Sequence, residues 1–114
     1  WDFLIKELKS ATQLPVTIIY SPTFPLFYKN RVVFNSNEEK DLAAFREKCE
    51  QLGVNCLDLN KECIDLYLEK KQFHRGFFNT VPSTGHVNAN FNKILSQKIL
   101  NYLPKKVFDG IPPN

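Results

Sequence analysis

Two short apolar runs, over residues 15–20 and 54–59, constrain the fold of this chain more than any other feature. The first reads Pro-Val-Thr-Ile-Ile-Tyr, and a continuous β-branched run of this length predicts a strand covered on both faces, as in a parallel sheet. Between the runs, apolar side chains recur at three- and four-residue steps and predict a helix: Leu42, Phe45, Cys49 and Leu52, with Gly53 at its end. Because a helix connects the two strands, we expect them to be adjacent, parallel and central.

Apolar periodicity predicts further helices over residues 2–12 and 61–71, and from about Asn88 to Leu103 before Pro104. Strands that alternate with helices predict an α/β fold of three layers, α/β/α, around a parallel sheet. A third strand is expected only if residues 76–79 are extended.

Such a sheet is thin, since doubly wound domains have about five strands. We therefore expect an incomplete sheet, with a preceding part of the fold absent from this chain or supplied by a second chain. An exposed apolar surface near Trp1, Phe3 and Leu4 is where that part would pack.

The composition predicts a single domain over residues 1–114, with an extended tail at 105–114. Apolar residues make up 43% of the chain and charged residues 24%, which is typical of a globular protein. The formal net charge is +3 and the lysines are scattered among glutamates, which argues against nucleic acid as a partner. No apolar run is long enough for a membrane span, and no pattern assigns a localisation.

The three cysteines, Cys49, Cys56 and Cys63, are seven residues apart. Zinc sites use close pairs and four ligands, so we expect no metal ion, and no motif indicates a cofactor. Core packing is the expected role of Cys49 and Cys56. Cys63 could approach Cys56 across a strand-to-helix turn, and the disulfide pairing and the redox compartment stay open.

Residues 21–37 form a long connection with a heavy aromatic content: Phe24, Phe27, Tyr28 and Phe34. Connections of more than about 12–15 residues are usually functional or mobile, so this one is a candidate wall of a pocket. The alternative is that its rings only pin the connection onto the core.

The segment from Gly76 to Asn88 places His86 in a turn-rich loop before the last helix. Catalytic side chains often occupy such loops at the end of a sheet, although a surface histidine is the simpler interpretation. Asp58, near the end of the second strand, is a candidate orienter of His86 or a cap for the following helix. His74 follows a lysine-rich helix end, which predicts either a solvated side chain or one that interacts with the C-terminal dipole of that helix.

Three stretches together resemble the C-terminal half of an SGNH (GDSL-like) hydrolase: Leu14–Pro22, Gly53–Leu59 and Gly85–Asn88 with the helix after it. The resemblance covers about residues 10–103 and implies a flavodoxin-like fold that cleaves acyl esters. It also implies that His86 is the general base of a Ser-His mechanism. Ser83 stands where the family usually has an orienting aspartate, and is thus a candidate orienter.

The chain contains no Gly-Asp-Ser segment, so the resemblance implies a nucleophile outside these residues and a chain that is inactive alone. The first function is therefore a histidine-bearing part of an ester hydrolase acting on a small-molecule ester. The alternative is a non-catalytic α/β binding or interaction domain of the same fold. A flavodoxin-like module with another ligand is disfavoured, because no phosphate-binding loop follows either strand.

Overall fold

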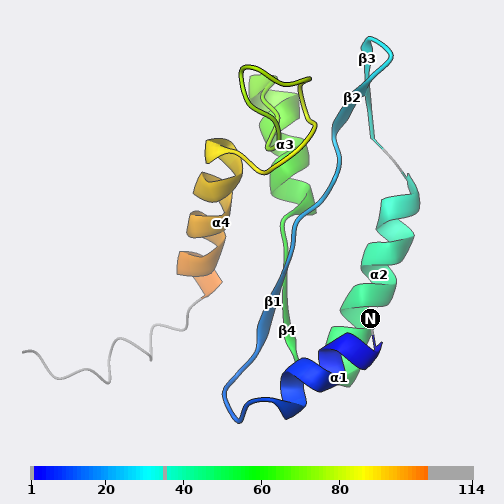
Figure 1. Cartoon of the computed structure of the whole chain (residues 1–114), viewed down its shortest axis with the longest axis vertical. Helices are drawn as coiled ribbons and strands as arrows, with labels where there is room; N and C mark the ends of the chain where they lie inside the picture. The colour runs from blue at the N-terminus through cyan, green and yellow to red at the C-terminus, as the bar shows by residue number, and fades with distance from the viewer. Residues whose placement is uncertain (1, 35, 103–114) are drawn as a thin grey trace, which may run out of the picture.

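The computed structural model describes residues 2–34 and 36–102, without the side chains of residues 36–38 (Figure 1). The expectations for Trp1, for the end of the last helix at Leu103 and for the tail at 105–114 lie outside the described residues. The elements in chain order are α1 (Asp2–Ser10), β1 (Thr17–Tyr20), β2 (Leu26–Tyr28), β3 (Arg31–Val33), α2 (Ser36–Gln51), β4 (Asn55–Asp58), α3 (Asn60–Lys70) and α4 (Ala89–Tyr102).

The strands β1 and β4 form a two-stranded parallel sheet, as the two apolar runs predicted. Thr17 pairs with Asn55 at one end of the ladder and Tyr20 pairs with Asp58 at the other. The mixed α/β class and the parallel strand pair are thus confirmed. A sheet of two strands is too small to define a flavodoxin-like topology.

Two hydrophobic clusters hold helices against the strand pair. The larger cluster joins α1, α2 and the start of β4 and contains Ile5, Leu42, Phe45, Cys49 and Val54. The smaller one joins α3 and α4 and contains Leu59, Cys63 and Phe91. Figure 1 shows the strand pair nearly edge-on, with α4 on one side and α1 and α2 on the other.

The prediction that the first strand is covered on both faces is wrong. Burial alternates along β1: Ile18 and Tyr20 pack against the larger cluster, whereas Thr17 and Ile19 are exposed. The side chain of Ile19 remains 39% exposed. The sequence does not reveal this alternation, because a β-branched apolar run is compatible both with a strand covered on two faces and with one covered on a single face.

The long connection contains a β-hairpin that the sequence analysis missed. β2 and β3 pair antiparallel, with Leu26 opposite Val33. The turn residues Lys29 and Asn30 both have left-handed backbones, at φ 47° and 60°, as a two-residue type I′ turn requires. Asn30, which lies between two short apolar runs, was the residue in the sequence that indicated this turn. Residues 76–79 form no strand, and the only pairing near them is a single antiparallel bridge between Arg75 and Val87.

Phe3 and Leu4 are exposed on α1, with 77% of Phe3 accessible, so the expected apolar surface is present at these two positions. None of the helices within the described residues is long and apolar enough to cross a membrane.

Candidate functional site

A loop over residues 71–88 lies beyond the carboxyl ends of β1 and β4, where open α/β sheets usually bind ligands (Figure 1). Two consecutive residues fasten this loop to the chain that leaves β1. His74 Nε2 donates to the carbonyl oxygen of Pro22 at 2.8 Å, and Arg75 Nε donates to the same oxygen at 3.0 Å. The guanidinium of Arg75 also reaches Ser21 Oγ at 2.9 Å and the Gly85 carbonyl at 3.1 Å.

The expectation of a solvated His74 is wrong. Its side chain is completely buried and its ring lies 6.1 Å from the ring of Phe91. The Pro22 carbonyl lies outside the strand ladder and needs a hydrogen-bond donor, which the imidazole supplies. The sequence could not reveal this contact, because the two residues are 52 positions apart.

Asn88 organises the other end of the loop. Its amide nitrogen donates to the carbonyls of Phe73 and Gly76 at 3.0 and 3.1 Å. Its amide oxygen accepts from the backbone N–H of Asn90 at 3.0 Å and of Phe91 at 3.3 Å, and so caps α4. The side chain of Asn88 thus satisfies backbone groups of the loop and of α4.

His86 lies on the surface of this loop, three residues before α4 begins at Ala89. Its backbone carbonyl accepts from Gly76 N at 3.0 Å. Within the described residues, its exposed ring forms no hydrogen bond. One ring nitrogen is therefore open, as a general base needs, but no acceptor orients the other. The catalytic role of His86 stays a prediction.

The two candidate orienters are engaged elsewhere. Ser83 is buried with a left-handed backbone at φ 68°, and its Oγ accepts from the backbone N–H of Phe27 at 2.6 Å. Asp58 accepts from the backbone N–H of Asn60 at 2.8 Å and forms an ion pair with Arg46 of α2. Ser83 thus positions the hairpin, and Asp58 bonds to the first backbone N–H of α3 and ties the end of β4 to α2. The N-cap position of α3 itself is Leu59, without a side-chain cap. Neither Ser83 nor Asp58 has a hydrogen bond from its side chain to His86, so the structure does not bring the three residues together.

None of the three cysteines forms a disulfide, and the thiols of Cys49 and Cys56 are poorly suited to nucleophilic chemistry. Burial raises the pKa of Cys49, and burial together with neighbouring Cys49 raises the pKa of Cys56 to about 11. Both thiols are therefore protonated at neutral pH. Across residues 2–34 and 36–102, no group of His, Cys, Asp and Glu side chains is arranged to hold a metal ion.

Two cavities in the described structure lie away from His86. One of about 330 Å³ opens between α3 and α4, where Glu62 pairs with Lys98. Another of about 410 Å³ lies beside the end of α1 and Gly53. His86, Ser83 and Asp58 line neither cavity.

The fold and this site define a mixed α/β domain with a loop clamped over the ends of a parallel strand pair. Comparison with known proteins places it no more closely: no family model, no curated protein and no solved structure matches the chain.

Proposed function

We propose that this chain is a non-catalytic interaction module whose sheet is extended by a β-strand from another polypeptide segment. The observation that carries the proposal is the sheet itself. Among the described residues, β1 has β4 as its only neighbour and β4 has β1, so each strand keeps one edge without a partner strand. Unpaired edges present a row of backbone donors and acceptors that an added strand can satisfy.

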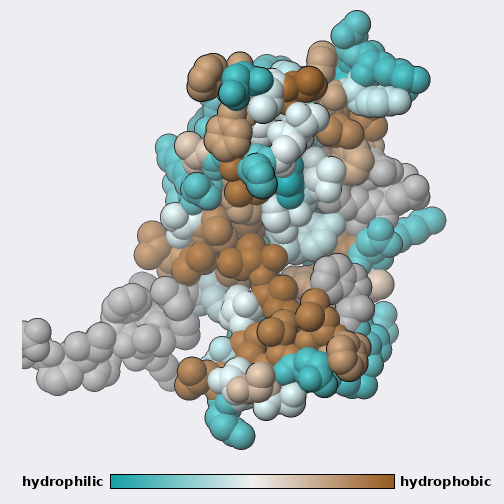
Figure 2. All heavy atoms as spheres, viewed as in Figure 1, coloured by the Kyte–Doolittle hydropathy of each residue, from teal (hydrophilic) through white to brown (hydrophobic). Residues whose placement is uncertain are grey.

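The surface beside the strand pair has the character such a contact needs. Figure 2 shows hydrophobic atoms that extend from α4 across the strand pair towards α1. Exposed apolar side chains near the two ends of β1 include Leu14 and Ile19. A parallel strand is normally buried by neighbours on both sides, so this surface suits a further strand and the helix that crosses over to it.

The prolines at positions 15 and 22 limit where a strand can be added to β1. Proline has no backbone N–H, so the pairing edge is confined to the residues between them. The added strand would therefore match residues 16–20 and bring its connecting chain out beside Ser21. A sheet extended in this way would approach the flavodoxin-like, three-layer fold expected from the sequence.

A library of short peptides with alternating valine and threonine tests this proposal. Selected peptides should bind the chain in an extended conformation, and Ile19→Lys should weaken binding about tenfold or more by placing a charge on the contact face. Leu68→Lys, at an exposed position of α3 outside this surface, is the matched control and should leave affinity unchanged. Equal affinities for the Ile19→Lys variant and the unchanged chain would refute strand addition at β1.

A second proposal is the ester hydrolase in which His86 is the general base and the added segment supplies the serine. The exposed His86 ring beyond the strand ends favours it, because an added strand would also end at that edge. Hydrolysis of p-nitrophenyl acetate by the chain joined to such a segment tests it. His86→Ala should remove most activity and Lys93→Ala should not; full activity of His86→Ala would exclude this mechanism.

A further inference from the structure

Two segments at the end of the molecule beyond the strand pair, residues 21–34 and 70–88, carry basic residues and no acidic ones, and we call them the cationic end. The acidic side chains of α3, Glu62, Asp65 and Glu69, lie beside them. Neither segment contains aspartate or glutamate, and together they contribute five basic side chains: Lys29, Arg31, Lys70, Lys71 and Arg75. These charges exceed the +3 of the whole chain, so the remaining sequence carries a net negative charge. Positive charge is therefore concentrated in these two segments.

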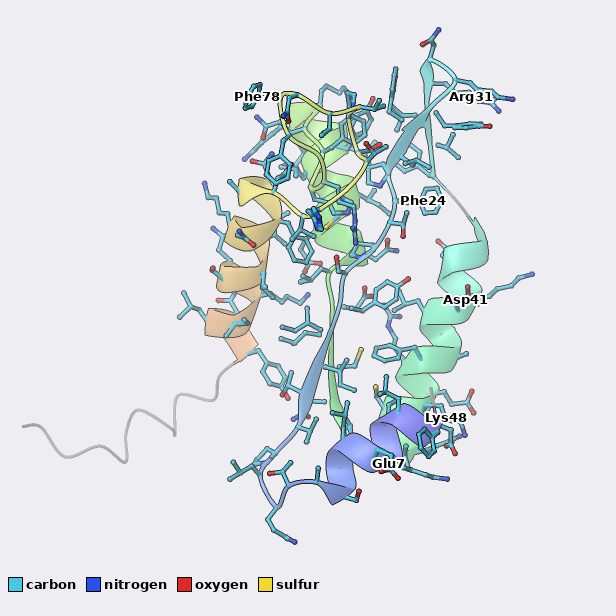
Figure 3. All side chains as sticks on the ribbon, in the orientation of Figure 1. Glu7, Phe24, Arg31, Asp41, Lys48 and Phe78 are labelled. Atoms are coloured by element: carbon cyan, nitrogen blue, oxygen red, sulfur yellow. The ribbon has the colours of Figure 1, made fainter. Side chains whose placement is uncertain are left out.

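The two segments of the cationic end are joined in space. Phe27 N donates to Ser83 Oγ at 2.6 Å, and Arg75 bonds to Ser21, so the hairpin and the loop lie against one another. Figure 3 shows Arg31 and Phe78 pointing outward at the same end of the molecule. Within the described residues, no carboxylate forms an ion pair with these five side chains. Because Arg75 is held by its bonds within the loop, the positive charge that a partner can reach belongs to the exposed side chains of Lys29, Arg31, Lys70 and Lys71.

Apolar rings project from the same end. Phe78 is completely exposed, and Phe77, Val81 and Tyr28 are each about half exposed. Thr80 holds the turn that presents Phe78: its Oγ1 accepts from Phe77 N at 2.8 Å and donates to Phe77 O at 3.0 Å. A fully exposed phenylalanine at the tip of a hydrogen-bonded turn is already ordered for contact, so little conformational entropy is lost on binding.

We propose that the cationic end binds the surface of a lipid bilayer that contains anionic headgroups. Phe77 and Phe78 insert into the boundary between headgroups and acyl chains, and the surrounding lysine and arginine side chains pair with lipid phosphates and carboxylates. Aromatic and aliphatic side chains flanked by basic ones are the combination that interfacial binding uses. Proteins that stack nucleic-acid bases instead line a groove along the backbone, whereas Phe78 stands at a protruding tip. This surface is separate from the strand edges.

Flotation of the 114-residue chain with vesicles tests the proposal. Vesicles of phosphatidylcholine mixed with phosphatidylserine, which have the negative surface potential of a cytoplasmic leaflet, should bind the chain. Vesicles of phosphatidylcholine alone should bind the chain at least tenfold more weakly. Added salt should weaken the binding to the anionic vesicles, because salt screens exposed charges. Phe77→Ser with Phe78→Ser should lower the affinity about tenfold or more, through lost apolar burial. Arg31→Gln with Lys70→Gln should lower it about fivefold for each charge.

Matched substitutions elsewhere on the molecule distinguish specific binding by the cationic end from nonspecific adsorption to vesicles. Phe3→Ser removes an exposed phenylalanine on α1, and Lys40→Gln with Lys93→Gln removes two exposed charges on α2 and α4; neither change should alter binding. Circular dichroism confirms that each variant is folded. The proposal would be overturned if the chain bound neutral and anionic vesicles equally, or if the control variants lost as much affinity as the variants of the cationic end. It would also be overturned if the chain bound a single-stranded oligonucleotide tightly and did not bind vesicles.

Discussion

Arg75 donates a hydrogen bond from its guanidinium to the hydroxyl of Ser21 at 2.9 Å, across 54 positions of sequence. With its bonds to Pro22 and Gly85, it connects the exit of β1 to both ends of the loop that carries His86. Hydrogen bonds from a charged donor are worth more than neutral ones, and here one side chain makes several.

Arg75→Ala should therefore lower the free energy of unfolding by about 2–3 kcal/mol, because carbonyls that it satisfies lose a charged donor. Urea denaturation measures this change. Arg31→Ala, whose side chain is exposed on the hairpin, is the matched control and should change stability by less than about 0.5 kcal/mol. Similar losses for the two variants would show that the Arg75 bonds do not organise the loop.

The two histidines should differ sharply in their contribution to stability. His74→Ala removes a completely buried ring and the donor to Pro22, and should cost about 2–4 kcal/mol of unfolding free energy. His86→Ala removes an exposed ring without a hydrogen bond to described residues, and should cost less than about 0.5 kcal/mol. Thermal denaturation of both variants checks this contrast; a stable His74→Ala protein would contradict the buried clamp.

Ser83→Ala should destabilise the chain by about 1–3 kcal/mol, since the backbone N–H of Phe27 loses its acceptor in a partly buried position. Thr84→Ala is the neighbouring control, because its hydroxyl only reinforces an exposed turn at Val81. Amide exchange of Phe27 should quicken in Ser83→Ala and stay unchanged in Thr84→Ala. Slow exchange in both variants would argue against the hairpin contact.

The raised pKa of Cys56 predicts a loss of stability in alkali. Burial moves this pKa from 9.0 to about 11, so between these values the unfolded chain releases a proton that the folded chain retains. The contribution is fully present below pH 9 and is lost as the pH rises through 11. Denaturation at pH 8 and pH 10.5 should show a smaller pH-dependent loss in Cys56→Ala than in the unchanged chain. An identical loss would contradict the burial of this thiol.

Sequence periodicity was sufficient for the elements that depend on neighbouring residues. The helix before Gly53 and the strand pair both follow from spacing and local backbone preference. The β2–β3 hairpin was not predicted, because its turn contains no glycine, although Asn30 indicated a turn there.

The candidate site depended on contacts between distant residues, which periodicity does not encode. The partners of His74 and Arg75 lie more than 50 positions earlier, and Arg46 reaches Asp58 from another helix. The sequence therefore located the histidine loop at the correct edge of the strand pair but left its hydrogen-bond organisation undetermined. The assignment of His86 as a general base stays a prediction.

Residue-resolved amide exchange on β1 and β4, with and without a bound strand-forming peptide, tests the central claim most directly. In the free chain, amides within the β1–β4 ladder should exchange slowly, whereas amides on the outer edges should exchange quickly. Adding the peptide should protect outer-edge amides among residues 17–20 or 55–58 and leave α1 and α4 unchanged. Outer-edge amides that are already protected in the free monomer, or that stay unprotected in the complex, would contradict an open sheet completed by an added strand.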